Sequence, residues 1–188
     1  MEASDGELLQ RLARGDRDAL APLVERHQRR LFRIAVAYLR DPDEALDAVQ
    51  ETFVKAYCNA ARWDPRSEVG AWLTRIAINQ SIDRYRRVRR RQAAEAPLES
   101  EAGDHDPRWT AGDPSPERRL LGREVSEKIA SALRGLPARQ RAVFVLRHYE
   151  EMRLEDIANT LGMSLGTVKS SLHRAVHRLR DRLQGLMA

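Results

Sequence analysis

Apolar residues recur at intervals of three and four along residues 1–91, and this spacing is typical of amphipathic helices. The first helical stretch is short and ends near Gly15; its predicted inward positions are Leu8, Leu9 and Leu12. Asp16 can cap a longer second helix, because a short acidic side chain accepts hydrogen bonds from free backbone N–H groups. The predicted inward positions of this helix are Leu20, Leu23, Val24, Leu31, Ile34 and Tyr38.

Two further helices are predicted in this part of the chain. Asp41 and Pro42 begin the third helix, since aspartate caps a helix and proline fits its first turn. Its apolar stripe consists of Leu46, Val49, Phe53 and Tyr57. The segment from Ala61 to Gly70 contains Asp64-Pro65 and indicates a loop. We expect a fourth helix from about Ala71 to Arg90.

Helical spacing also fills the last third of the chain. Ser115-Pro116-Glu117 begins one predicted helix, whose apolar face is Leu121, Val125, Ile129 and Leu133. Leu136-Pro137 begins another, which contains Val143, Phe144 and Leu146, and two shorter helices follow. No strand-like alternation of apolar and polar positions persists anywhere, so the sequence predicts an all-α fold.

Residues 92–116 differ from the segments on both sides. Half of the chain's prolines lie here, at positions 97, 107, 114 and 116, among acidic residues and few apolar ones. Such a segment cannot bury enough apolar surface to offset the entropy that ordering would remove. We therefore predict two small helical domains, residues 1–91 and 117–188, joined by a flexible acidic linker.

Composition narrows the class of protein. The 188-residue chain carries 33 Lys and Arg against 28 Asp and Glu, and nearly all the cations are arginines, which suit bidentate contacts to phosphate and carboxylate groups. The single cysteine, Cys58, leaves no internal disulfide or cysteine-rich zinc site. No apolar run is long enough to span a membrane and no secretory leader is evident, so we expect a cytoplasmic protein without membrane insertion.

Motifs for catalysis or cofactor binding are missing from the sequence. The five histidines form no HExxH motif or triad signature, and there is no Gly-rich phosphate loop. His173 and His177 lie one helical turn apart and could bind a metal, but no carboxylate is evident to complete that site. We therefore expect no enzyme activity, no cofactor and no metal.

The sharpest local pattern lies between Leu154 and Leu179. Gly162 permits a tight turn and Ser164 can cap the helix that follows, whose buried stripe is predicted to be Val168, Leu172, Ala175 and Leu179. This is the layout of a helix-turn-helix, whose second helix enters the DNA major groove. The side chains then free to read DNA are Gly166, Thr167, Lys169, Ser170, His173 and Arg174. An ordinary helical hairpin with a charged, solvated face is the alternative.

The predicted fourth helix changes character halfway along its length. Its first half, from Trp72 to Asn79, is largely apolar on all sides and should be buried, with Trp72 in the core. Its second half is mostly arginine, which favours contact with a polyanion. Trp63 and Asn79 lie near this basic surface, and aromatic side chains beside arginines can hold unstacked bases. The pattern leaves Trp63 open between this role and a core position.

The third helix carries acidic residues on its polar side. Asp43 and Glu44 lie in the first turn, where the helix dipole explains them. Asp47, Gln50 and Glu51 lie beyond that turn and form a polar surface patch. A docking site for another protein is one interpretation of this patch.

Five motifs, in their order and separation, resemble those of extracytoplasmic-function sigma factors. They are Asp47–Phe53 (DAVQETF), Trp72–Asn79 (WLTRIAIN), Leu136–Arg141 (LPARQR), Leu154–Ala158 (LEDIA) and Gly166–Ser170 (GTVKS). The resemblance covers nearly the whole chain apart from the linker. It implies that residues 1–91 correspond to region two, which grips the clamp coiled coil of core RNA polymerase and melts the promoter −10 element. Residues 117–188 would correspond to region four, which reads the −35 element and touches the polymerase flap.

The resemblance also implies roles for single residues. Polymerase docking would fall to Asp47, Gln50 and Glu51. Contacts to the −10 element would be made by Trp63, Ser67, Asn79, Arg84, Arg86 and Arg87. The −35 element would be read by Gly166, Thr167, Lys169, Ser170, His173 and Arg174. Members of this family are often held inactive by an anti-sigma factor, but no residue here identifies one.

A second function class is compatible with a helix-turn-helix. The chain could be a two-domain transcriptional regulator that senses a ligand and does not bind core polymerase stably. Such a regulator needs a sensory pocket or a phosphoacceptor arrangement in residues 1–91, and this segment ends instead in a basic helix. Tight, stoichiometric binding to core polymerase distinguishes the two classes.

Overall fold

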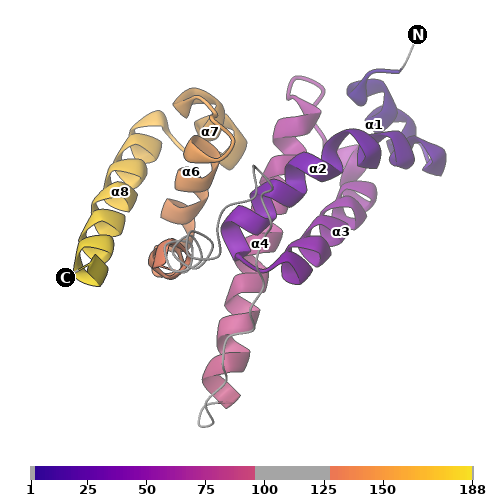
Figure 1. Cartoon of the computed structure of the whole chain (residues 1–188). Coiled ribbons are helices and arrows are strands. Elements are labelled where there is room, and N and C mark those ends of the chain that lie inside the picture. The colour runs from indigo at the N-terminus through magenta and orange to yellow at the C-terminus, as the bar shows by residue number, and fades with distance from the viewer. Residues whose placement is uncertain (1–2, 96–127, 188) are drawn as a thin grey trace, which may run out of the picture.

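The computed structural model describes residues 3–95 and 128–187, and all regular structure in these two segments is helical (Figure 1). The first segment contains α1 (Asp5–Ala13), α2 (Leu20–Leu39), α3 (Pro42–Asn59) and α4 (Val69–Glu95), with short 3-10 helices at Arg17–Ala19 and Ala60–Arg62. The second contains a helix at residues 128–134, followed by α6 (Ala138–His148), α7 (Leu154–Leu161) and α8 (Leu165–Met187). The predicted all-α fold is confirmed.

Capping chemistry sets the starts of the first helices. Ser4 caps α1 through a capping box with Glu7. Asp16 accepts a hydrogen bond from the backbone N–H of Asp18 and so begins a 3-10 turn, and α2 starts only at Leu20. The predicted start of the second helix was therefore three residues early, because Asp16 is used to cap the shorter element.

The start of α3 agrees with the sequence prediction. The Asp41 carboxylate accepts hydrogen bonds from the backbone N–H groups of Asp43 and Glu44, at 3.0 and 3.1 Å, and Pro42 occupies the first turn. Helix α4 is longer than predicted at both ends. It runs past Arg90 to Glu95 because residues 92–95, Gln-Ala-Ala-Glu, are good helix formers. The rest of the predicted linker, residues 96–116, and the predicted helix start at residues 115–117 lie outside the described residues.

The helix-turn-helix forms between α7 and α8. Gly162 ends α7 in the left-handed conformation, with φ of 62°, which glycine adopts without strain. The Ser164 hydroxyl accepts a hydrogen bond from the backbone N–H of Thr167 at 3.1 Å, as expected of a cap. Helix α8 has 23 residues, so the prediction of a short last helix was wrong. No proline or glycine interrupts its arginine-rich second half before Gly185.

The two described segments share one hydrophobic core. Buried residues of the C-terminal helices join the same cluster as those of α1 to α4; they include Val143, Leu146, Ile157 and Val168. In Figure 1, α6 and α7 lie between α8 and the α2–α4 pair. A second, smaller cluster holds the 128–134 helix against α8 and consists of Ala132, Leu133, Leu136, Ala175 and Leu179.

Arg141 of α6 is fully buried where the two segments meet. Its guanidinium donates hydrogen bonds to the backbone carbonyls of Arg134 and Leu136, at 2.5 and 3.5 Å, and to that of Tyr38 at 3.4 Å. The guanidinium carbon also lies 4.9 Å from the ring centre of Tyr38 and 4.0 Å from that of Tyr85. The positive charge is therefore balanced by carbonyl dipoles and aromatic faces.

Two polar contacts support this junction. Burial raises the pKa of Tyr38 to about 12, so its hydroxyl stays protonated and donates a hydrogen bond to the Ala138 carbonyl at 3.3 Å. The side chain of Glu150 is only 4% exposed and forms ion pairs with two arginines of α2, Arg30 and Arg33. Both contacts connect α2 with the C-terminal segment.

Candidate nucleic-acid interface

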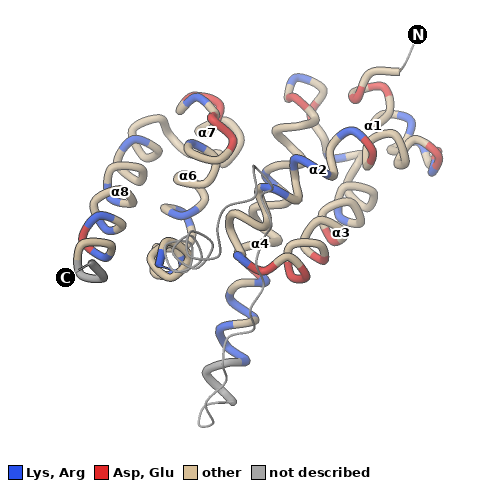
Figure 2. The backbone as a smooth tube through the Cα atoms, viewed as in Figure 1, with Lys and Arg blue, Asp and Glu red and all other residues tan. Residues whose placement is uncertain are grey.

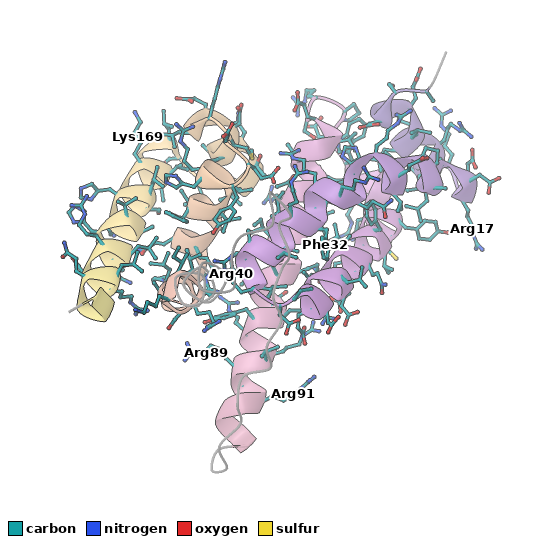
Figure 3. The ribbon with its side chains drawn as sticks, in the orientation of Figure 1. Arg17, Phe32, Arg40, Arg89, Arg91 and Lys169 are labelled. Carbon is teal, nitrogen blue, oxygen red and sulfur yellow. The ribbon has the colours of Figure 1, made fainter. Side chains whose placement is uncertain are left out.

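Helix α8 presents its predicted DNA-reading side chains to solvent. Val168 and Ala175 are fully buried and Leu172 is half-buried, which fixes the rotation of the helix. The exposed residues on its outer side include Gly166, Thr167, Lys169, Ser170, His173 and Arg174. Figure 3 shows Lys169 at the start of α8, on the side away from α2 and α4. This face can therefore approach a duplex without rearrangement of the helix-turn-helix.

Two polar contacts within α8 order this face. The Arg174 guanidinium donates hydrogen bonds to the backbone carbonyl and hydroxyl oxygens of Ser170, both at 3.1 Å. The Nε2 atoms of His173 and His177 lie 3.2 Å apart, one helical turn from each other. Both arginine and histidine can exchange these local contacts for base edges or phosphates.

A hollow of about 630 Å³ lies beside the middle of α4. Asn79 is exposed at this hollow, and half-buried Trp72 lines it as well. Trp72, which the sequence placed in the core, therefore packs against the core and also faces the hollow. The other lining residues of α3 and α4 include Lys55, Asn59, Ile76, Asp83 and Arg86.

The C-terminal segment reaches the same hollow. Ala138 and Arg139, at the start of α6, belong to its lining. Gln80 also lines it, and this side chain is 2% exposed with its Oε1 lacking a hydrogen-bond partner among the described residues. An aromatic ring, three amide side chains and several cations thus surround a space that a planar, polar molecule can enter.

Trp63 and Ser67 line a different hollow, of about 520 Å³, between α1 and the loop before α4. The Trp63 ring is half-buried and packs over the first turn of α1, where a Cβ on Gly6 would meet its Cη2 at 3.2 Å. The indole Nε1 is buried and has no hydrogen-bond partner among the described residues. The structure therefore does not bring Trp63 and Asn79 into one pocket.

The loop before α4 is ordered by its own ion pair. The Asp64 carboxylate accepts hydrogen bonds from the side chain and the backbone N–H of Arg66, which hold the pKa of Asp64 down at about 2. Ser67 donates from its hydroxyl to the Asp64 carbonyl at 2.7 Å. The loop therefore keeps this closed turn over the whole physiological pH range.

The second half of α4 forms a basic surface (Figure 2). Arg86 and Arg87 are exposed, with their side chains 63% and 54% accessible. Arg89 and Arg91 project to opposite sides of the helix (Figure 3). Cations spread around a helix in this way suit the backbone of a single strand or duplex.

The acidic side of α3 faces this basic helix, and Arg84 joins the two. The Arg84 side chain is only 15% exposed and forms ion pairs with Glu44 at 2.5 Å, Asp47 at 2.9 Å and Glu51 at 3.3 Å. Arg84, predicted at the −10 surface, therefore lies against the acidic side of α3. The α3 patch, defined as Asp47, Gln50 and Glu51, is otherwise exposed or half-buried.

Two exposed apolar residues, Leu46 and Val54, extend the α3 patch, and the sequence did not predict their exposure. Leu46 is 50% exposed and Val54 is 61% exposed, and both lie one helical turn from Gln50 on the same face. Leu46 was assigned to the buried stripe. An exposed apolar strip beside carboxylates is typical of a surface that another protein covers.

Metal binding finds no support among the described side chains, since no group of three or more His, Cys, Asp and Glu is placed to hold an ion. In the same part of the chain, no helix is both long and apolar enough to cross a membrane.

Comparison with known proteins shows which family the chain resembles. A family model described as sigma-70 region 2 matches residues 23–91, and one described as sigma-70 region 4 matches residues 126–179. The chain is 30% identical over 187 residues to the ECF RNA polymerase sigma factor SigW of Bacillus subtilis, covering 99% of this chain and 100% of the relative. It is 32% identical over 192 residues to the RNA polymerase sigma-H factor of Pseudomonas aeruginosa, covering 99% and 97%.

Solved structures extend the similarity to the arrangement of the helices. The structure of CnrH in complex with the cytosolic domain of CnrY matches with a TM-score of 0.66 and 27% identity over 97% of this chain and 99% of that chain. The sigma factor RpoE in complex with the anti-sigma factor NepR, from Bartonella quintana, gives 0.62 and 25% over 87% and 96%. The chain belongs to the extracytoplasmic-function sigma factors of the sigma-70 family, which are transcription initiation factors for RNA polymerase. The resemblance inferred from the five motifs is confirmed.

Proposed function

We propose that the two described segments divide the work of promoter recognition. Helices α2 to α4 dock on core polymerase and open the −10 element, and α8 reads the −35 element. One observation carries this assignment: a single chain combines an exposed reading face on α8 with a separate hollow, lined by Trp72 and Asn79, beside a basic helix. Run-off transcription with purified core polymerase tests it directly.

The proposal includes a compartment and a regulatory partner. Because core polymerase and promoter DNA are cytoplasmic in bacteria, we assign the protein's action to that compartment, without a catalytic centre of its own. The solved relative RpoE is bound by the anti-sigma factor NepR, and its match spans 87% of this chain. An anti-sigma factor is therefore proposed as a further partner of this chain.

Changing Asp47 and Gln50 together to alanine should weaken binding to core polymerase about tenfold or more, since both side chains lie on the exposed α3 patch. Glu25→Ala with Gln28→Ala is the matched control, because it removes one carboxylate and one amide from an exposed part of α2. Titration of labelled protein against core measures both variants. Equal affinity of the two double variants would refute docking through the α3 patch.

Arg174→Ala should weaken binding to a duplex that contains the preferred −35 sequence. If Arg174 contacts a base, we expect a loss of roughly 1–3 kcal/mol and relaxed discrimination at that base. If it contacts a phosphate, the loss should be similar on a scrambled duplex and should reduce the salt dependence of binding. Fluorescence anisotropy at several salt concentrations separates these results, and wild-type affinity on both duplexes would exclude Arg174 from the reading face.

A further inference from the structure

Three carboxylates of α3 converge on one arginine of α4. Glu44, Asp47 and Glu51 lie on successive turns of α3, so their side chains form one stripe along the helix. Like charges at these spacings repel each other and destabilise a helix. Arg84 lies 2.5–3.3 Å from an oxygen of each carboxylate and is the cation that contacts all three, while Arg87 adds a longer contact of 3.8 Å to Glu51 alone.

Its contacts with α3 hold the Arg84 guanidinium in place. Burial acts to lower its pKa, but the hydrogen bond and charge of Glu44, together with the charges of Glu51 and Asp47, outweigh it and raise the pKa above the usual arginine value. Its Nε is buried and has no hydrogen-bond partner among the described residues. The side chain is therefore held by its two terminal nitrogens, both of which point toward α3.

The three carboxylates that contact Arg84 differ in their exposure to solvent. The side chain of Glu44 is 26% exposed, that of Glu51 is 35% exposed and that of Asp47 is 54% exposed. Asp47 thus presents one side to Arg84 and the other to solvent, next to Gln50 and the apolar strip. A carboxylate held in this way needs no further loss of side-chain freedom when a partner binds.

We propose that Arg84 is a positioning residue for polymerase docking, which fixes Asp47 and Glu51 in the orientation that the polymerase recognises. The inference rests on the proposed docking role of the α3 patch. Arg84 lies in a basic helix, and this position predicted contact with DNA. The proposal gives Arg84 a role at a protein interface. The neighbouring arginines Arg86 and Arg87 are more exposed and make only longer ion pairs, with Asp83 at 3.9 Å and with Glu51 at 3.8 Å.

This role has a kinetic signature. An acidic patch is complementary to a basic partner surface. Without Arg84 the patch is more negative and less ordered, so long-range attraction to such a surface persists while the docked geometry is lost. Arg84→Ala should therefore speed dissociation from core polymerase about tenfold and leave association no slower, because loss of a buried charge contact acts mainly on dissociation. Association of the variant should also depend more steeply on salt.

The experiment measures association and dissociation of the full chain with purified core polymerase by biolayer interferometry. Arg84→Ala is compared with Arg84→Lys, which keeps the charge but not the planar fork, and with Arg86→Ala, an exposed neighbour that should change dissociation less than about twofold. Arg84→Lys should dissociate at an intermediate rate. In an Asp47→Ala background, Arg84→Ala should add less than about twofold, since two residues that act through one contact are not additive.

The outcomes separate this inference from the proposed function. If the wild-type chain fails to bind core polymerase, the proposed function itself is wrong. If the wild type binds and Arg84→Ala and Arg84→Lys both dissociate at the wild-type rate, the positioning role is refuted. The same conclusion follows if the Arg84 and Asp47 effects simply add. If Arg84→Ala docks normally but is impaired in strand opening, the positioning role is refuted and Arg84 belongs to the DNA-binding surface.

Discussion

Replacing Arg141 with alanine should lower the free energy of unfolding by about 3 kcal/mol. The variant leaves the carbonyls of Arg134, Leu136 and Tyr38 without their donor. It also leaves a cavity between the rings of Tyr38 and Tyr85. For a chain of this size the loss corresponds to a fall in Tm of roughly 10 °C.

Two further variants distinguish the causes of this loss. Arg141→Met fills most of the cavity but donates no hydrogen bond, so it should recover only part of the stability. Arg139→Ala is the matched control, because Arg139 lies half a turn away on α6 and is exposed; it should change Tm by about 1 °C or less. Circular dichroism during heating measures all three. An Arg141→Ala variant as stable as Arg139→Ala would show that the buried guanidinium contributes nothing to the junction.

Local chemistry allowed the sequence to predict much of the fold. The Asp41-Pro42 start of α3, the Gly162 turn and the Ser164 cap each depend on residues within three positions of one another. The rotation of α8 also followed from spacing, because Val168 and Ala175 had to face inward together. Predictions that rest on such short-range rules depend little on distant contacts, although Asp16 capped a 3-10 turn and not the helix expected to follow it.

Roles that depend on distant contacts were not predictable in the same way. In the sequence, Arg84 is one of several arginines in a basic run. Only the packing of α3 against α4 brings it close to three carboxylates. Arg141 reads as a surface residue of a helix, yet it is fully buried because α6 packs on α2 and α4. A charged residue becomes buried only when partners far away in sequence compensate for its lost hydration, and periodicity alone does not identify them.

The same limit explains the two tryptophans. Trp72 lies in an apolar run and was assigned to the core, whereas Trp63 lies in a loop and was a candidate for stacking on a base. The structure gives Trp72 a face on the hollow of Asn79 and packs Trp63 over α1. Side chains of a helix can serve both core and surface when the helix borders a hollow, and the sequence does not reveal where a hollow lies.

Asn79→Ala should therefore leave polymerase docking and −35 binding intact but reduce open-complex formation about tenfold to a hundredfold. On the proposed function, strand opening relies on the capture of bases that unstack by thermal motion. Extruding a base costs a few kcal/mol, and stacking on an aromatic ring returns about 1–3 kcal/mol. Since these terms nearly balance, an amide that contributes a further 1–3 kcal/mol or so decides whether the bubble persists.

Permanganate footprinting on duplex and premelted −10 templates measures this effect. A premelted template should rescue Asn79→Ala only partly, because the lost contact is to the extruded base itself. Trp72→Leu keeps a smaller apolar side chain but loses the stacking face, so it should show the same defect, whereas Gln28→Ala removes an exposed amide outside the lining of the hollow and should behave as wild type. Full rescue of Asn79→Ala by premelting would mean that Asn79 acts before base capture. Normal bubble reactivity on the duplex would show that the base is held elsewhere, and the hollow of Trp63 and Ser67 would then be the next candidate.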